Sequence, residues 1–306
     1  MWNNRALVRI ICRGKDVPMR KYLIFTDSSA DLPQEIREEL DVRCLSLSVR
    51  FEGESSEYLN NEISPDAFYQ KMRGGGVGRT AAVNKESFAS AFSEAIDEGY
   101  DVLYIGFSSA LSGTYAAATV AAEELREGRP EARIITVDSL CASLGLGLLV
   151  YLTARKRIEG ATLDEAAEMA RKICGSVCHW FTVDDLVYLK RGGRISAASA
   201  AIGNLLSIKP ILHMDDGGHL VSVGNARGRQ ASVMALANKF AELASSEGSP
   251  EVFISHADCY SDAERLAEIL KTRHGVNISL ISDVGPVIGA HSGPGTLALF
   301  FIGRKR

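Results

Sequence analysis

A single histidine, His291, lies near the end of the sequence within a run of glycine and proline from 285 to 296. Histidine can donate a hydrogen bond or carry a positive charge near neutral pH, so it suits an anionic ligand. The density of glycine and proline predicts a rigid loop, not a helix or strand, where the backbone approaches a ligand closely. The alternative is an ordinary turn whose histidine hydrogen-bonds a carbonyl. The run by itself does not distinguish a ligand-binding loop from such a turn.

A cluster of hydroxyl side chains forms a second candidate site directly after the apolar segment 101–107. It comprises Ser108, Ser109, Ser112 and Thr114. We expect a helix to begin at Gly113 with Ser112 as its N-cap, which would create an anion site from free N–H groups and the helix dipole. Capping alone is the alternative, worth about 1 kcal/mol. Because capping requires only one hydroxyl, the additional hydroxyl side chains favour a ligand.

Two further segments imitate enzyme motifs. Residues 73–80 resemble a phosphate-binding loop, but an arginine replaces the lysine and the segment follows a predicted helix instead of a strand. We interpret it as a flexible loop that delivers Thr80. Residues 106–110 resemble the nucleophile elbow of hydrolases, in which Ser108 would act with His291, yet the final glycine of that motif is missing.

A third pattern could hold a metal ion. His213 and His219 flank a predicted hairpin turn that contains Asp215. Histidines of exposed hairpins are far more often free than metal-bound. We therefore predict no metal site and no cofactor.

Strand and helix patterns alternate from residue 19 onward, which predicts an α/β fold. In the first half, predicted strands cover 22–26, 43–51, 102–107 and 132–137. Predicted helices cover 32–40, 84–98, 113–127 and 143–158, and a short helix follows the cap Ser64. The helix at 143–158 is apolar on most sides, so it should be buried.

We place a domain boundary at Gly160, because it follows a basic last helical turn and Thr162 begins a newly capped helix. The prediction is a Rossmann-like parallel sheet in 19–159 and a second α/β domain with a mixed sheet in 160–306. Predicted elements of the second half are a strand at 177–183, a small-residue helix at 196–206, a hairpin over 208–223 and apolar strands at 278–281 and 297–302.

The composition excludes several classes of protein. A chain of 306 residues can build two domains, and a net charge of −4 argues against nucleic-acid binding. No apolar run approaches the roughly 20 residues of a membrane helix, so we expect no stable membrane insertion. The six cysteines show no zinc-type pairing, which favours a reducing cytoplasm.

Residues 1–18 differ from the rest of the chain. They are basic, and their apolar stretch 7–12 is short and interrupted by Arg9, unlike a signal peptide. We interpret 1–18 as a disordered arm or an over-long start, with Met19 as the natural first residue.

A protein that begins at Met19 should therefore keep its melting temperature and its ligand binding. Thermal denaturation of the two forms side by side checks this expectation. A large fall in melting temperature would contradict it.

Five ordered segments resemble the DegV family of bacterial fatty-acid-binding proteins. They are TDSSADL at 26–32, SALSGTY at 109–115, LKRGGRI at 189–195, KPIL at 209–212 and GAHSGPGT at 289–296. The resemblance covers nearly everything from Met19 onward, and it implies that a long-chain fatty acid lies between two α/β domains.

The resemblance also implies that the carboxylate of the fatty acid is held by Thr80, Ser112 and His291. Positions that would support this site are Ser109, Gly113, Thr114, Gly289 and Gly293. The chain departs from the family's usual Thr-Ser-Gln-Pro, because it reads TAAV at 80–83. This departure leaves open a carrier of another amphipathic acid.

A partner is implied as well. In the family, an ATP-dependent kinase subunit of the DAK type acts in trans on the carboxylate of the carried acid, and the carrier is not an enzyme by itself. Arg191, Arg194 and Lys209 are candidates to contact the phosphate or the kinase. The alternative is that they are ordinary solvated surface charges.

Burial of the acyl chain should dominate the binding energy. About fourteen methylenes at ~0.8 kcal/mol give ~11 kcal/mol before the costs of association. Each hydrogen bond to the carboxylate adds ~1.5–3 kcal/mol. The competing hypothesis is an acyl hydrolase or transferase that uses Ser108 or Ser112 with His291 and needs no partner.

Overall fold

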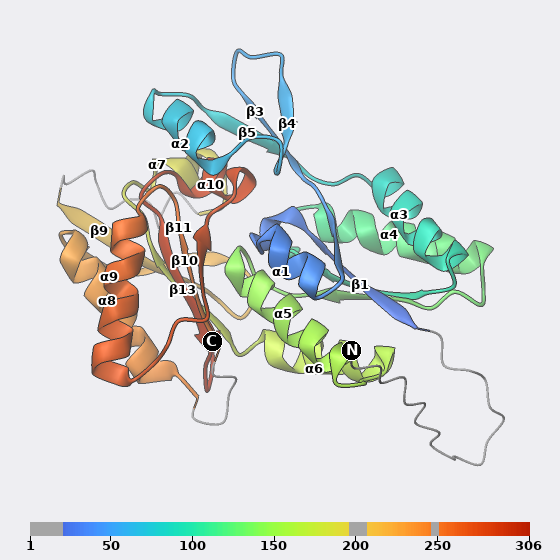
Figure 1. Cartoon of the computed structure of the whole chain (residues 1–306). Coiled ribbons are helices and arrows are strands. Elements are labelled where there is room, and N and C mark those ends of the chain that lie inside the picture. The colour runs from blue at the N-terminus through green and yellow to red at the C-terminus, as the bar shows by residue number, and fades with distance from the viewer. Residues whose placement is uncertain (1–20, 196–206, 246–250) are drawn as a thin grey trace, which may run out of the picture.

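The computed structural model describes residues 21–195, 207–245 and 251–306. The first half of the chain forms a four-stranded parallel sheet of order β2-β1-β6-β7 (Figure 1). Its strands are β1 (Tyr22–Asp27), β2 (Val42–Leu45), β6 (Asp101–Gly106) and β7 (Ile134–Asp138). All six residues of β1 and of β6 are buried, as is typical of central parallel strands covered on both faces.

The second half forms a six-stranded mixed sheet of order β10-β9-β8-β13-β11-β12. Its strands are β8 (Val177–Thr182), β9 (Ile208–Met214), β10 (Leu220–Arg227), β11 (Val252–His256), β12 (Leu280–Asp283) and β13 (Leu297–Ile302). Only β11 and β12 pair in parallel; the other neighbours are antiparallel. The two sheets confirm the predicted fold class.

Helix α5 (Leu144–Ile158) lies between the two sheets, which explains its apolar sequence (Figure 1). Its side chains share one core with those of β1 and β6 on one side and of β8 and β13 on the other. The outer face of the parallel sheet is covered by α3 (Lys85–Asp97) and α4 (Thr114–Gly128). The outer face of the mixed sheet is covered by α8 (Arg229–Leu243) and α9 (Tyr260–His274).

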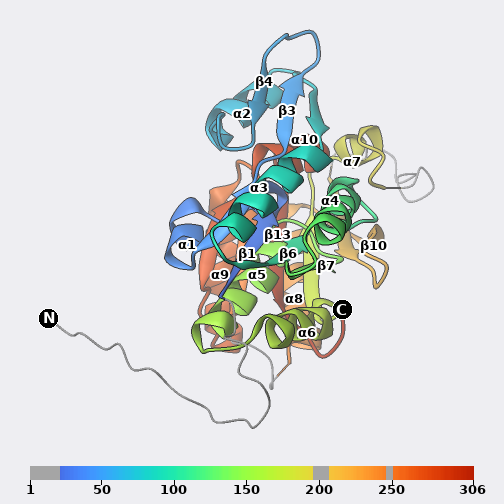
Figure 2. The same cartoon turned by 90° about the vertical axis from the view of Figure 1, so that its right-hand side faces the viewer.

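A small antiparallel sheet of order β4-β3-β5 projects beyond these layers together with α2 (Figure 2). Its strands are β3 (Ser48–Phe51), β4 (Glu57–Leu59) and β5 (Gly78–Ala81), and α2 covers Pro65–Arg73. Phe51, Phe68 and Tyr69 form an aromatic cluster that packs against Ala290 from the far end of the chain. Gly78 of β5, the strand that carries Thr80, also packs against Ala290, the residue before His291.

Two predictions for this region were wrong. The single strand predicted at 43–51 is two strands in different sheets, because the chain leaves the parallel sheet at Leu47, whose N–H donates to Ser28 Oγ (2.9 Å). The flexible loop predicted at 73–80 ends in strand β5, where Thr80 pairs with Val49. Pairing with β3 therefore holds Thr80 in place.

The prediction of a loop at 285–296 was also wrong, because Pro286–Ser292 form helix α10. Pro286 stands in the first turn, where its missing N–H costs no hydrogen bond. Gly289 faces Tyr69 so closely that a Cβ would lie 2.4 Å from the Tyr69 hydroxyl. Gly293 ends the helix with a φ of 81°, a conformation that favours glycine.

The boundary at Gly160, and with it the division into 19–159 and 160–306, stays a prediction. Thr162 caps α6 (Leu163–Cys174) as expected, and the structure adds a capping box with Glu165. Helix α6 packs against α5, β6 and β7, so this part of the second half contacts the first sheet. The predictions for 1–18 and for a helix at 196–206 lie outside the described residues.

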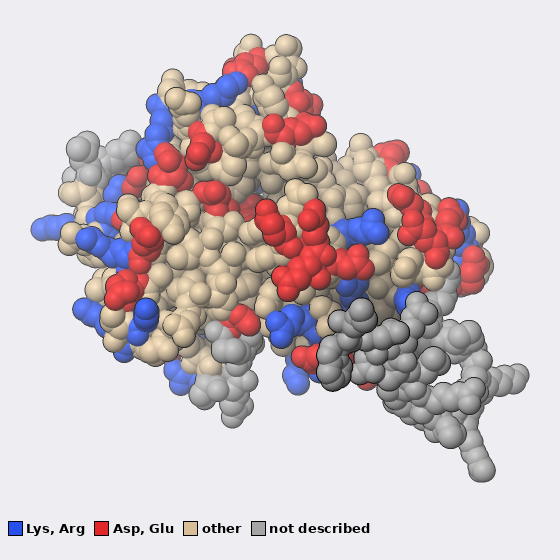
Figure 3. All heavy atoms as spheres, in the orientation of Figure 1, with Lys and Arg blue, Asp and Glu red and all other residues tan. Residues whose placement is uncertain are grey.

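The described helices include none that is both long and apolar enough to cross a membrane. Figure 3 shows acidic side chains gathered over the part of the surface where α1 (Gln34–Glu39) lies. This face has no continuous basic surface of the kind that binds nucleic-acid phosphates.

Candidate functional site

A cavity lies between the two larger sheets, beside the N-terminal end of α5. It contains about 970 Å³ of space not filled by atoms, part of it open to solvent. Its lining is mostly apolar and includes Phe107, Leu111, Phe181, Met214, Leu220 and Phe300. Such a cavity can take an elongated hydrocarbon chain.

Four polar side chains from separate elements line the same cavity. They are Thr80 of β5, Ser112 before α4, Arg194 after α7 (Val187–Arg191) and His291 of α10. Thr80 Oγ1 lies 2.8 Å from His291 Nε2. The three residues predicted to hold a carboxylate therefore line one cavity, although they are 32 or more positions apart in sequence.

The environment of His291 keeps its imidazole neutral. Burial, followed by the positive charges of Arg194 and Arg79, lowers the pKa of His291 to about 4. Its Nδ1 is buried without a hydrogen-bond partner among the described residues and faces Gly192, where a Cβ would lie 2.2 Å from this nitrogen. An unpaired acceptor is better tolerated than an unpaired donor, so the proton belongs on Nε2, directed at Thr80 Oγ1.

The serine turn differs in detail from the prediction. Helix α4 begins at Thr114 with Gly113 as N-cap, one residue later than expected, so Ser112 is not the N-cap. The Ser112 hydroxyl accepts from the Thr114 N–H (3.2 Å) and lies 2.9 Å from Thr114 Oγ1. Gly113 lines the cavity, whereas Ser109 is exposed and its N–H donates to Asp138.

The remaining predicted glycines support packing. Gly289 accommodates Tyr69, and a Cβ at Gly293 would lie 2.2 Å from the ring of Tyr188. Neither is among the residues that line the cavity.

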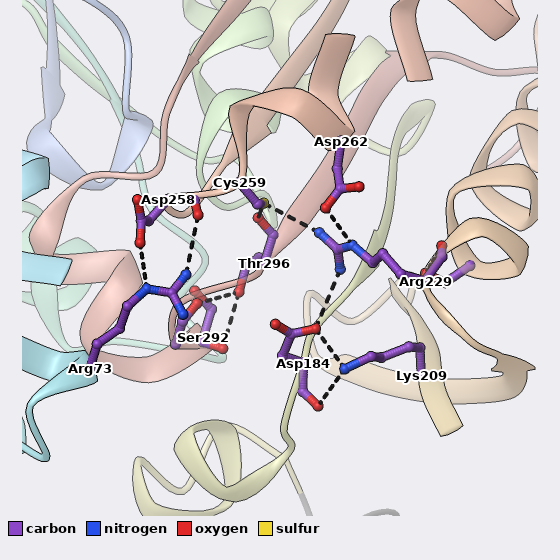
Figure 4. A network of polar contacts seen from close by, with 11 residues as sticks. Arg73, Asp184, Lys209, Arg229, Asp258, Cys259, Asp262, Ser292 and Thr296 are labelled. Carbon is purple, nitrogen blue, oxygen red and sulfur yellow. Dashed lines mark hydrogen bonds and ion pairs between the residues drawn. The ribbon is translucent and has the colours of Figure 1, made fainter. Parts of the chain in front are cut away.

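Of the three basic candidates, Arg194 lines the cavity. Its Nε donates to the carbonyl of Leu111 (3.1 Å), which ties α7 to the turn before α4. Arg191 is exposed and its guanidinium lies 5.7 Å from the ring centre of Tyr188. Lys209 is held 2.7 Å from Asp184 in a network that also includes Arg229 and Asp262 (Figure 4).

The residues of the hydrolase-like and metal-like patterns make other contacts in the structure. Ser108 is fully buried, and its hydroxyl donates to the carbonyl of Gly218 (2.9 Å). The ring of His213 stacks on Trp180 at 4.8 Å, while His219 is mostly exposed. Within the described ranges, no group of three His, Cys, Asp or Glu side chains is arranged to hold a metal ion.

Sequence reasoning missed a set of buried polar residues in the cavity wall. Ser143 donates to Asp31 Oδ2 (2.6 Å), and its hydroxyl lies 3.3 Å from that of Ser255. His179 accepts from the Ala142 N–H through Nε2 (3.2 Å), and its Nδ1 lies 2.9 Å from the carbonyl of Val177. Asp31 belongs to the opening motif TDSSADL, but no sequence signal links it to Ser143, 112 positions away.

This chain is similar to known proteins over nearly its whole length. A DegV domain-containing protein of Clostridium perfringens is 44% identical over 288 residues, which cover 93% of this chain and 98% of the relative. A solved DegV family protein of Thermus thermophilus, described by its fatty acid binding, is 31% identical with a TM-score of 0.82 over 92% of this chain and 99% of that one. A stearic acid-binding protein of Eubacterium ventriosum is 25% identical, with a TM-score of 0.82 over 92% and 98%.

The model of the family described as "Uncharacterised protein, DegV family" matches residues 21–304, which is nearly the whole described chain. Together with the full-length identity to curated relatives, this match shows that the chain belongs to the DegV family.

Proposed function

We propose that this chain carries a long-chain fatty acid in the cavity between its sheets, with the carboxylate at Thr80, Ser112 and His291. The observation that carries the proposal is the convergence of these three side chains on one apolar cavity. Similarity to solved proteins described as binding fatty acids supports the same ligand class. The cysteine pattern supports a cytoplasmic carrier.

The hydrogen bonds suggest how the carboxylate is held. With His291 Nε2–H directed at Thr80 Oγ1, the Thr80 hydroxyl proton is free to donate to a carboxylate oxygen. Ser112 can donate a second bond, and Arg194 supplies a positive charge. His291 then acts as a positioning residue, because it orients the Thr80 hydroxyl.

The proposed role includes a partner. A carboxylate held beside Arg194, which lines the cavity, is suited to phosphorylation by an ATP-dependent kinase in trans. Arg194 would then bind the added phosphoryl group, with Arg191 and Lys209 as further candidates to contact the phosphate or the kinase. The carrier itself supplies binding and orientation.

Removal of the Thr80 hydroxyl should weaken fatty-acid binding. Thr80→Val deletes a hydrogen bond to a charged group worth ~1.5–3 kcal/mol, so we expect Kd for palmitate to rise about 10- to 100-fold. Binding of hexadecanol, which lacks the carboxylate, should change much less. Ser109→Ala removes an exposed hydroxyl from the turn that also contains Ser112, and it is the control.

The positioning role of His291 predicts strong coupling between the two residues. If His291 acts through Thr80, adding His291→Ala to Thr80→Val should cost little more than Thr80→Val alone. Additive losses measured by calorimetry would assign His291 a direct contact with the ligand instead.

Mass spectrometry of lipid extracted from the purified protein tests the carrier directly. We expect a long-chain fatty acid in stoichiometric amount, and no turnover of p-nitrophenyl esters without a partner. An empty extract with no uptake of added palmitate would contradict the carrier. Ester turnover that disappears in Ser112→Ala would favour the hydrolase.

A further inference from the structure

One wall of the apolar cavity carries a polar pair. Ser255 of β11 is fully buried and Ser143, the residue before α5, is 6% exposed, and both line the cavity. Their hydroxyl oxygens are 3.3 Å apart. Ser143 has a φ of 49°, an unfavourable conformation for a residue other than glycine, so the fold maintains this arrangement at a cost.

Strand register places this pair at mid-depth in the cavity. Ser255 pairs with Ala298 of β13, which pairs with Phe181 of β8. Phe300 lies two residues after Ala298 on β13, and Thr296 lies two residues before it, directly ahead of the strand; each is about 7 Å away, and both also line the cavity. The Thr296 end is nearer to α10 and His291, so Ser255 lies between the proposed carboxylate site and the Phe300 end.

The direction of the hydrogen bonds determines what Ser255 offers to the cavity. The single hydroxyl proton of Ser143 is donated to Asp31 Oδ2. Ser143 can then only accept from Ser255, so the Ser255 hydroxyl donates to Ser143 and the lone pairs of its oxygen stay available as acceptors. An alkyl chain alone would leave this acceptor without a partner, whereas a hydroxyl group would donate to it.

A second polar atom on the same lining supports a ligand that carries an oxygen. Ser292 is 6% exposed, and its hydroxyl has no hydrogen-bond partner among the described residues. Ser292 lines the cavity next to His291. Ser292 lies at the end of the cavity where the carboxylate is proposed, so its hydroxyl is available to that group, and Ser255 is the polar position farther from it.

We propose that the pair Ser143–Ser255 recognises a hydroxyl group on the acyl chain, so that the preferred ligand is a monohydroxylated long-chain fatty acid. This inference rests on the proposed function, because it requires the acyl chain to pass Ser255. The ligand hydroxyl donates to Ser255 Oγ, and the hydrogen-bond chain continues through Ser143 to Asp31.

Competition binding with a panel of C18 acids tests the inference on the full chain. Stearate is compared with its 9-, 10- and 12-hydroxy forms at pH 8, above the pKa of about 7 to which burial raises Asp31. We expect at least one isomer to bind about tenfold more tightly than stearate, because it satisfies a buried acceptor that stearate leaves unpaired. Ser255→Ala should remove this advantage and leave stearate binding intact.

Two further variants keep the test decisive. Ser282→Ala changes the serine that pairs with Ser255 on β12 and does not line the cavity, so it should keep the advantage. Ser255→Cys preserves side-chain size but is a poor acceptor, and it replaces Ser255→Ala if that variant does not fold. The inference is wrong if stearate binds and no isomer binds more tightly, or if the advantage survives both Ser255 variants. If neither stearate nor any isomer binds, the proposed carrier function itself fails.

Discussion

Replacement of Ala298 by phenylalanine should reduce the affinity for palmitate about 1,000-fold. Ala298 lies in the middle of β13, is 6% exposed and lines the cavity between Ser255 and Phe181. A phenyl ring there would exclude the distal part of the acyl chain. Loss of five or six buried methylenes at ~0.8 kcal/mol each corresponds to ~4–5 kcal/mol, which is about 1,000-fold or more.

Ligand length provides the control for this variant. Octanoate does not need the distal half of the cavity, so its weak binding should be nearly equal in Ala298→Phe and the unchanged protein. Ala298→Val should give an intermediate loss for palmitate. The melting temperature without ligand should change little, since the ring fills existing space. Equal palmitate affinity in all three proteins would place the acyl chain elsewhere.

Replacement of Asp31 by asparagine should stabilise the protein at pH 8 and much less at pH 4. Burial, opposed by hydrogen bonds from Ser143 and Gly285, raises the pKa of Asp31 from 3.8 to about 7. Between about pH 4 and pH 7 the folded protein keeps a proton that the unfolded chain releases. The free energy of unfolding therefore falls as the pH rises through this window, and the loss is complete above pH 7.

The size of this effect follows from the two pKa values. A rise from 3.8 to about 7 corresponds to at most about 4 kcal/mol, and since Asp31 is only partly enclosed we expect about 2 kcal/mol. Asparagine avoids the cost because it carries no charge. Its Oδ1 can still accept from the Gly285 N–H, and its Nδ2 can donate to Ser143 Oγ in place of the bond that Asp31 accepts.

Urea denaturation at pH 4, 6 and 8 measures the difference between Asp31→Asn and the unchanged protein. Asp27 and Asp283 also have pKa values raised by burial, and they contribute to the pH dependence of stability in both proteins. The difference in unfolding free energy between the two proteins isolates the contribution of Asp31. Asp216→Asn, at the exposed hairpin turn, is the control. A stability difference that stays constant with pH would contradict the assignment to Asp31.

Local sequence patterns determined most of the secondary structure. The caps Ser64, Asn84 and Thr162 were expected to begin helices, and each caps one. These patterns depend on neighbours within one or two turns, which sequence displays directly. The apolar sequence of α5 likewise required burial, and the structure places it between two sheets.

The sequence misled where a tertiary contact decides the local conformation. The run 285–296 contains too much glycine and proline for a helix judged by propensity, yet α10 forms there. Gly289 is needed because Tyr69 packs against it, and Tyr69 in turn donates to the carbonyl of Val284. Propensity is a weak prior, and close packing of this kind overrides it.

The sequence likewise identified part of the candidate site, and the tertiary structure supplied the rest. Motifs alone were enough to identify Thr80, Ser112 and His291 as ligand-binding candidates and to place the chain in its family. Only the tertiary structure showed that His291 bonds Thr80, that Arg194 lines the same cavity, and that Ser143 links Asp31 to Ser255. The hydrogen bonds among these residues join positions 112 to 211 apart, where the distance between two side chains depends on how sheets and helices pack and not on any local pattern.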